Sequence, residues 1–286
     1  EMKKALGVPI LCALQGEDIF LEGLIEPYKS QALKLLQKRT VDVDGFIAPC
    51  QYYADFMAGY LNIPADKIHV VKLGLNLQGH GDEQKQSPLT PPSQRGEEPF
   101  IIGYLARICP EKGLHLLVDA FYQLTERVGA DKIRLKVAGY LGKRDKPYFE
   151  EVRKQIDTWE LTDAFEHWGE VDLHQKIVFL NNLHVLSVPT TYKEPKGLYV
   201  LEALANGVPV VQPRHGSFPE LIAATGGGIL VHTESPDAIA EGILQLMKDA
   251  NYREKLGRRG KEVVHRAFSD DVMAEKTLAV YRKYLS

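Results

Sequence analysis

The chain has 286 residues, of which 44% are hydrophobic and 26% are charged, and its formal net charge is −3. A chain of this length can bury a sizeable core in one large domain or two ordinary ones, and its charge balance argues against nucleic-acid binding, which usually needs a basic excess. No apolar run approaches the ~20 residues that span a bilayer.

The first 75 residues predict part of a parallel α/β sheet. Short β-rich runs at 8–14 ("VPILCAL"), 45–50 ("GFIAPC") and 67–73 ("KIHVVKL") alternate with helical patterns at 28–38 and 51–61. This alternation is typical of βαβ units. The runs make up about half of a Rossmann-like domain, and position 1 is Glu1 rather than methionine. We therefore expect the chain to be truncated at its N-terminus.

The predicted domain boundary is the segment 76–99, "NLQGHGDEQKQSPLTPPSQRGEEP". It has almost no large apolar residue and is rich in Pro, Gly, Gln and Ser. A segment of this composition cannot bury enough apolar surface to offset the entropy lost on ordering. It therefore predicts a flexible linker or insertion.

Residues 100–268 predict a complete doubly wound sheet, a second Rossmann-like domain. The expected strands lie at 100–106, 133–139, 164–169, 183–189, 208–213 and 227–231. The expected helices lie at 114–128, 148–159, 172–182, 198–207, 218–225 and 237–249. We expect residues 269–286 to form a C-terminal helix that crosses back to the first domain.

Ligands of such sheets bind at the carboxyl ends of the strands, and the loop after 100–106 carries two cations. It reads "RICPEKGLHLL", with Arg107 and Lys112 just before Gly113 and a predicted helix. A helix N-terminus presents unpaired N–H groups and partial positive charge, to which Arg adds a bidentate fork and Lys a mobile charge. The loop suits a diphosphate, and a solvated surface loop is the alternative interpretation.

The loop after 183–189 carries two carboxylates. Glu194, Lys196 and Gly197 precede a helix expected to begin near Leu198, which places Glu202 in its first turns. Carboxylates accept hydrogen bonds from vicinal hydroxyls, so the pair suits a sugar or a ribose, and a glycine lets the backbone approach a ligand closely. The alternative is that Glu202 is simply a glutamate favoured by the helix dipole.

Two further loops have mainly structural interpretations. Ser217 and Glu220 match the S-x-x-E capping box, and the nearby lone His215 is more often structural than catalytic. The basic run at 143–146 ("KRDK") predicts a solvated face, with contact to an anionic acceptor or a membrane surface as the alternative.

The cysteines are far apart and form no CxxC pair; they are Cys12, Cys50 and Cys109. This spacing predicts free thiols in a reducing compartment. We therefore expect a cytoplasmic location, either free or peripheral at the inner face of the cell membrane.

Taken in order, these motifs resemble the retaining glycosyltransferases of family 4, also called glycosyl transferases group 1. "LARICPEKG" is similar to the family pattern G-R-x-x-x-E-K-G, and Glu194 and Glu202 have the spacing of its E-x7-E motif. "LEALANGVPVVQPRHGSFPEL" through "TGGGILV" is similar to the stretch that follows, and "FIAPCQYYADFM" to an earlier segment, with Cys50 in a serine position. The resemblance covers nearly the whole chain from Gly7 onward.

The resemblance implies a GT-B fold, with one complete C-terminal Rossmann-like domain and the C-terminal half of an N-terminal, acceptor-side one (1–75). It implies transfer of a hexose from a UDP-, GDP- or ADP-sugar to a hydroxyl acceptor with retention of configuration. In this family retention is commonly explained by front-face attack assisted by the donor phosphate. No metal or other cofactor is expected, because fixed cations stabilise the charge that Mg²⁺ would otherwise stabilise.

The resemblance also implies roles for individual residues. Arg107 and Lys112 would hold the donor diphosphate, Glu202 would bind the donor ribose, and Glu194 would bind the transferred sugar near the reacting carbon. Val171 would lie beside the nucleobase through its backbone. The remaining expected donor contacts are Lys196, Gly197 and Leu198.

The chain departs from the family pattern at two places. The usual E-G-F-G is Glu194-Pro195-Lys196-Gly197 here, so Lys196 is expected to add a phosphate or sugar contact. Gln15 stands where many members have a cleft histidine.

Two other functions stay open. The chain could be an inactive or incomplete nucleotide-sugar-binding module, because the first strands of the N-terminal domain are not in it. A glycoside hydrolase would explain the paired glutamates, but it would not explain the paired cations.

Overall fold

The structure is a computed structural model that describes residues 2–81 and 98–285. By contacts between Cα atoms the chain divides into two units. Unit 1 consists of residues 1–76, 194–197 and 267–286, and unit 2 of residues 77–193 and 198–266. The predicted linker, 76–99, falls largely on residues 82–97, which lie outside the described residues.

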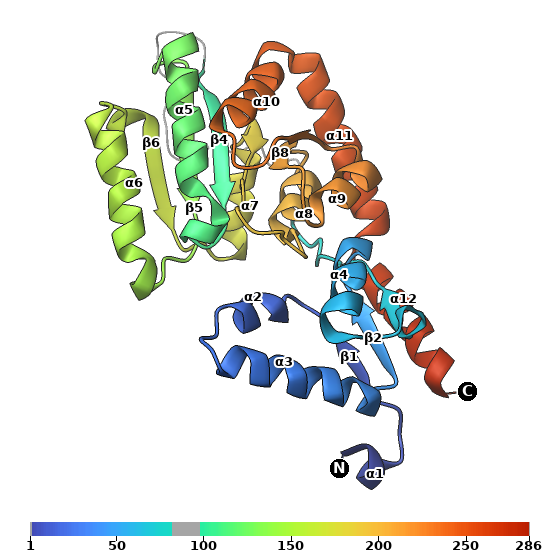
Figure 1. Ribbon diagram of the computed structural model, residues 1–286. Helices are drawn as coiled ribbons and strands as arrows, with labels where there is room; N and C mark the ends of the chain where they lie inside the picture. Colours follow the sequence, from blue (N-terminus) through green and yellow to red (C-terminus); the bar gives the residue numbers. More distant parts are fainter. Residues whose placement is uncertain (1, 82–97, 286) are drawn as a thin grey trace. The chain divides into compact units, whose positions relative to one another are not determined.

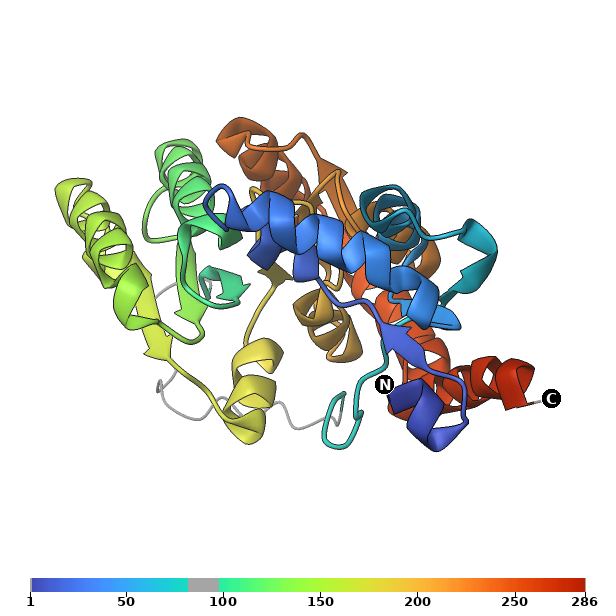
Figure 2. The same ribbon diagram turned by 60° about the horizontal axis from the view of Figure 1, so that its bottom comes forward.

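Unit 1 contains a three-stranded parallel sheet with strand order β1-β2-β3. The strands are β1 (Leu11–Ala13), β2 (Gly45–Ala48) and β3 (Ile68–Val70). The helices are α1 (Met2–Leu6), α2 (Glu17–Glu22), α3 (Tyr28–Arg39), α4 (Gln51–Leu61) and α12 (Asp270–Leu285), with 3₁₀ turns η1 (Thr40–Asp42) and η2 (Ala65–Lys67). Figure 2 brings α3, the long blue helix, to the front, and α3 contacts both α2 and α4.

Helix α4 supplies much of the core of unit 1. It begins after Cys50, whose extended backbone lets Sγ accept a hydrogen bond from the Tyr53 amide at 3.4 Å. It ends at Asn62, which has φ +55°, the left-handed conformation common just after a helix. Met57 and Leu61, four residues apart and so on one face, are buried in the cluster that covers the sheet.

Helix α12 packs on the sheet of unit 1 although it lies at the far end of the sequence (Figure 1). The Leu75 amide donates to the Phe268 carbonyl at 2.8 Å, and the Asp270 amide donates to the Leu75 carbonyl at 2.9 Å. Near its other end, Tyr284 Oη lies 2.8 Å from His69 Nε2 on β3. Hydrogen bonds at both ends thus hold α12 against this sheet.

Unit 2 contains a six-stranded parallel sheet with strand order β6-β5-β4-β7-β8-β9. The strands are β4 (Phe100–Leu105), β5 (Ile133–Ala138), β6 (Phe165–Gly169), β7 (Val185–Leu186), β8 (Val210–Pro213) and β9 (Gly228–Val231). The helices are α5 (Leu114–Val128), α6 (Lys146–Thr158), α7 (Leu173–Asn181), α8 (Leu198–Ala205), α9 (Phe218–Thr225), α10 (Pro236–Lys248) and α11 (Ala250–Ala267). The 3₁₀ turns are η3 (Pro110–Lys112), η4 (Lys143–Asp145) and η5 (Thr162–Ala164). The α/β class and the expected doubly wound sheet are confirmed.

The order of the strands reverses between β4 and β7. From β4 the chain proceeds outward through β5 and β6, then returns to the other side of β4 as β7 and proceeds through β8 and β9. Gly103 on β4 pairs with Leu186 on β7, and a Cβ at Gly103 would lie 2.1 Å from a Leu183 methyl group. The reversal is a topological switch point, which is the position at which open α/β sheets bind their ligands.

The core of unit 2 lies between the sheet and its helices. Helix α5 lies between α6 and α10 (Figure 1), and it contacts both. Leu117, Phe121 and Leu124 face inward from α5, and Ile243 and Leu246 from α10, all with 0% exposure. Burial of each such side chain contributes roughly 1.5–3 kcal/mol, which makes the strand ends a rigid support for the loops.

The predicted capping box at Ser217 and Glu220 is wrong. Ser217 has φ −77° and ψ −15°, and its side chain makes no capping hydrogen bond. Because a capping residue normally has an extended backbone, the helical conformation of Ser217 turns its hydroxyl away from the amides of α9. A capping box does occur at the start of α7, where Asp172 and Gln175 exchange hydrogen bonds.

Candidate functional site

Two loops meet at the switch point of unit 2: residues 106–113 after β4 and residues 187–193 after β7. The Thr191 amide donates to the Glu111 carbonyl at 3.0 Å. Lys112 Nζ donates to Tyr192 Oη at 2.6 Å. These contacts hold the loop Arg107–Gly113, which the sequence predicts to bind a diphosphate, against the loop that leads toward α8.

Gly113 permits this close approach. Its φ is +71°, and a Cβ at this position would lie 1.9 Å from the Pro189 carbonyl oxygen. A side chain would therefore meet both left-handed backbone strain and a rigid backbone neighbour.

Arg107 is exposed at the carboxyl end of β4. Its carbonyl accepts a hydrogen bond from Tyr104 Oη at 3.0 Å, and its Nε donates to Cys109 Sγ at 3.3 Å. Within the part of the chain that the structure describes, its guanidinium forms no salt bridge to a carboxylate. The hydrogen bond to Cys109 raises the pKa of Arg107 above its ordinary value. The loop after β4 therefore carries a side chain that is always positively charged.

Lys112 is surrounded by aromatic side chains. Its ammonium lies 4.9 Å from the ring centre of Tyr192 and 5.3 Å from that of Tyr199. Contacts of this kind attract a cation to the face of a ring. Tyr199 is in the first turn of α8, three residues before Glu202 and thus on the same side of the helix.

The N-terminus of α5 is already partly occupied. The His115 amide donates to Tyr148 Oη at 3.0 Å. The sequence predicts an unpaired amide here that could bind an anion, but this amide already has an acceptor. Burial is the main cause that raises the pKa of Tyr148, to about 12. Tyr148 therefore remains a neutral hydroxyl beside the loop, and the anion site rests on the two side-chain cations.

Lys176 on helix α7 connects that helix to Glu202 on α8. Val171 directly precedes Asp172, which begins α7, and Lys176 on that helix forms an ion pair with Glu202 at 2.7 Å. The start of α7 and the middle of α8 thus lie side by side in unit 2.

Glu194, Lys196 and Gly197 group with unit 1. Glu194 is 4% exposed, and its Oε1 accepts a hydrogen bond from the Lys196 amide at 3.2 Å. Gly197 has φ +62°. Lys196 Nζ donates to Gln15 Oε1 at 3.3 Å, so two residues far apart in sequence meet as polar neighbours.

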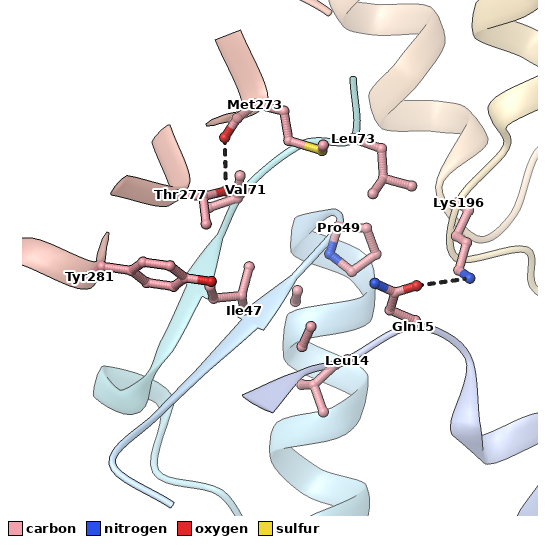
Figure 3. A pocket seen from close by; sticks show the side chains of 12 residues that line it. Leu14, Gln15, Ile47, Pro49, Val71, Leu73, Lys196, Met273, Thr277 and Tyr281 are labelled. Atoms are coloured by element: carbon pink, nitrogen blue, oxygen red, sulfur yellow. Dashed lines mark hydrogen bonds between the residues drawn. The ribbon is translucent and has the colours of Figure 1, made fainter. Parts of the chain in front are cut away.

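Gln15 and Lys196 border a pocket of about 130 Å³ at the carboxyl ends of β1–β3 (Figure 3). Most of its other lining side chains are apolar, among them Leu14, Ile47 and Val71. The pocket therefore has a polar end and an apolar wall, as ligand sites commonly do.

The structure thus gathers the predicted residues into two groups. Unit 2 holds Arg107, Lys112, Val171, Leu198 and Glu202, and unit 1 holds Gln15, Glu194, Lys196 and Gly197. The two glutamates belong to different units, so their convergence on one donor stays a prediction. Sequence reasoning missed Tyr148, Lys176 and Tyr192, because their roles depend on contacts between distant segments.

Other features of the site are structural. His215 Nε2 lies 2.9 Å from the Thr190 carbonyl oxygen, so it joins the loops after β7 and β8. All three cysteines are free thiols. Among residues 2–81 and 98–285, no group of His, Cys, Asp or Glu is arranged to hold a metal ion, and no helix there is long and apolar enough to cross a membrane.

A doubly wound parallel sheet with cations in a loop at its switch point is an arrangement found in many α/β proteins that bind phosphorylated ligands. The family model of glycosyl transferases group 1 matches residues 87–263, more than half of the chain. The chain therefore belongs to this family of glycosyltransferases, family 4, with the GT-B fold.

Curated relatives share between a quarter and a third of the aligned residues. An uncharacterized glycosyltransferase of Methanocaldococcus jannaschii is 29% identical over 225 residues, which cover 77% of this chain and 55% of the relative. A GDP-mannose-dependent alpha-(1-6)-phosphatidylinositol monomannoside mannosyltransferase of Mycobacterium tuberculosis is 28% identical over 187 residues, covering 63% and 46%. The chain spans about half the length of these relatives.

Solved structures show the same fold. HepE of Anabaena in complex with UDP aligns with a TM-score of 0.80 and 19% identity, covering 98% of this chain and 74% of that one. A glycosyltransferase of Rickettsia africae aligns with a TM-score of 0.77 and 18% identity, covering 100% and 79%.

Proposed function

We propose that this chain is the donor-binding part of a retaining glycosyltransferase that moves a hexose from a nucleotide sugar to a hydroxyl acceptor. The observation that carries the proposal is the pair of cations, Arg107 and Lys112, at the switch point of the sheet, with Glu202 on α8, the helix whose Tyr199 ring lies 5.3 Å from the Lys112 ammonium. The names of similar proteins support the donor class, since one is GDP-mannose-dependent and another was solved with UDP.

In the proposed mechanism Arg107 and Lys112 hold the donor diphosphate and stabilise the negative charge that grows on it as the bond to the sugar breaks. Glu202 accepts hydrogen bonds from the ribose, and the backbone at Val171 and Leu198 lines the nucleoside. Glu194 binds the hydroxyls of the transferred sugar. The acceptor oxygen attacks the anomeric carbon from the face that the phosphate leaves, and its proton passes to a phosphate oxygen.

We assign the acceptor side to unit 1. Lys196 and Gln15 border the pocket at the ends of β1–β3, and we propose that the acceptor binds there. The three free thiols favour a reducing compartment, and we propose a cytoplasmic location, including the inner face of the cell membrane.

The test of donor binding is titration calorimetry with UDP-, GDP- and ADP-sugars on the wild-type chain and on Glu202→Ala. We expect one donor class to bind, and the variant to bind it at least five-fold more weakly, since an ion-type hydrogen bond contributes about 1.5–3 kcal/mol. Absence of binding by every donor, or equal binding by the variant, would remove the site assignment. Glu170→Ala, an exposed glutamate just before Val171, is the control.

The second function is an incomplete nucleotide-sugar-binding module. The observation in its favour is that the chain spans about half of its relatives' length. It predicts that this chain binds the donor without transferring sugar, whereas a longer natural chain transfers it. Transfer by the 286-residue chain alone would refute it.

A further inference from the structure

One ion pair in the donor site has no role in the mechanism above. Lys176 Nζ lies 2.7 Å from Glu202 Oε1, and the two side chains are only 26% and 16% exposed. A partly buried pair is screened less by solvent and salt than a surface pair. Lys176 is therefore a permanent neighbour of the carboxylate proposed to bind the ribose.

Helix α7 places Lys176 accurately. The helix begins with the reciprocal hydrogen bonds of Asp172 and Gln175, and the Lys176 amide donates to the Asp172 carbonyl at 2.8 Å. Further along, Phe179 is fully buried and packs edge-on against Trp168. Lys176 thus lies on a helix that is capped at Asp172, directly after Val171, and that is packed in the core at Phe179.

The other contacts of Glu202 add no positive charge. Asn206 Nδ2 donates to the Glu202 carbonyl at 2.8 Å and lies 2.8 Å from Nδ1 of His80. His80 is 4% exposed, and burial is the main cause that lowers its pKa, so it is neutral at neutral pH. Among described residues, Lys176 is the cation that forms a salt bridge with Glu202.

The ion pair also leaves room for a ligand. Lys176 bonds Oε1 of Glu202, and a carboxylate has a second oxygen that can accept hydrogen bonds from a hydroxyl. Ribose binding and the ion pair are therefore compatible.

We propose that Lys176 is a positioning residue of the donor site, which orients the Glu202 carboxylate and cancels its charge so that a nucleoside diphosphate can bind beside it. The inference rests on the proposed function. With Lys176, the formal charges of Arg107, Lys112, Lys176 and Glu202 sum to +2; without it they sum to +1. Loss of this positive charge should lower the affinity for the diphosphate and leave the affinity for an uncharged nucleoside unchanged.

The test compares Lys176→Met with wild type in calorimetric titrations of a nucleoside, its monophosphate and its diphosphate, using the base that wild type prefers. We expect the variant to bind the diphosphate about five-fold more weakly, the effect of one unit charge at about 8 Å with an effective dielectric constant of about 40. The nucleoside should change less than two-fold. Lys154→Met, which removes an exposed charge on α6, should leave all three affinities unchanged.

A conservative variant separates the charge of Lys176 from the other consequences of replacing it. Lys176→Arg keeps a cation beside Glu202, so it should bind the diphosphate with close to wild-type affinity. If Lys176→Arg binds the diphosphate as weakly as Lys176→Met, or if the nucleoside loses as much affinity as the diphosphate in Lys176→Met, the inference is wrong. Failure of wild type to bind any diphosphate would instead refute the proposed function.

Discussion

Replacement of Gly113 by alanine should damage unit 2 far more than the same change at Gly169. Both glycines have nearly the same backbone conformation, with φ +71° and φ +70°. A Cβ at Gly169 has nothing within 4 Å, whereas a Cβ at Gly113 lies 1.9 Å from the Pro189 carbonyl oxygen. The pair therefore separates backbone strain from steric conflict.

The magnitudes follow from these contacts. A left-handed alanine costs about 1–2 kcal/mol, which is the whole expected effect at Gly169. At Gly113 the loops after β4 and β7 must also separate by about 1.5 Å to reach an ordinary contact of 3.4 Å from the present 1.9 Å. Forcing extra atoms into a packed site typically costs a further 1–3 kcal/mol.

The assay is urea unfolding followed by tryptophan fluorescence. The chain has two tryptophans, Trp159 and Trp168, and both lie in unit 2, so the signal reports that unit. Gly113→Ala should also weaken binding of nucleoside diphosphates, because the moved loop carries Lys112. Equal losses of stability in the two variants would show that the approach to Pro189 is not a rigid constraint.

Three further predictions concern unit 2. The Ile101 amide donates to Nδ1 of His184 at 2.9 Å, and burial is the main cause that lowers the pKa of His184 to about 4. In the unfolded state His184 has a pKa near 6.5, so that state takes up a proton first, and the free energy of unfolding should fall by up to about 3 kcal/mol as the pH drops from 6.5 toward 4. Urea unfolding of wild type and of His184→Asn at pH 7 and pH 4.5 checks this prediction. Equal pH dependence of the two proteins would contradict it. Tyr192→Phe removes the hydroxyl that accepts the hydrogen bond from Lys112. It should weaken diphosphate binding, measured by calorimetry, about five-fold, and unchanged affinity would contradict this prediction. Tyr148→Phe leaves an amide of α5 without its acceptor and should lower the free energy of unfolding by about 1–2 kcal/mol, measured by urea unfolding; no loss would mean that water replaces the hydroxyl.

Much of the fold could be predicted because local and global signals agree. Each expected strand of unit 2 forms, since short β-rich runs such as 100–106 are separated by amphipathic helices such as 114–128. The cations at Arg107 and Lys112 were identifiable because a βα loop of a parallel sheet always lies at its ligand-binding edge.

Other features depended on tertiary contacts. Helix α11 has a polar sequence, and glycines at 257 and 260 weaken its helical pattern; they are buried because the helix packs closely there, where a Cβ at Gly257 would lie 2.1 Å from the Gly207 carbonyl oxygen. The capping motif at Ser217 failed because the backbone there is helical. The pairing of Lys176 with Glu202 joins residues 26 positions apart, which spacing alone does not reveal.

The central claim is that the loops at the switch point of unit 2 bind the nucleoside diphosphate of a sugar donor. Hydrogen–deuterium exchange of the 286-residue chain, with and without the diphosphate that binds best in calorimetry, tests it most directly. The account predicts slower exchange in peptides that cover Arg107–Gly113, Val171–Lys176 and Leu198–Glu202. Binding that leaves exchange in all three segments unchanged would contradict it.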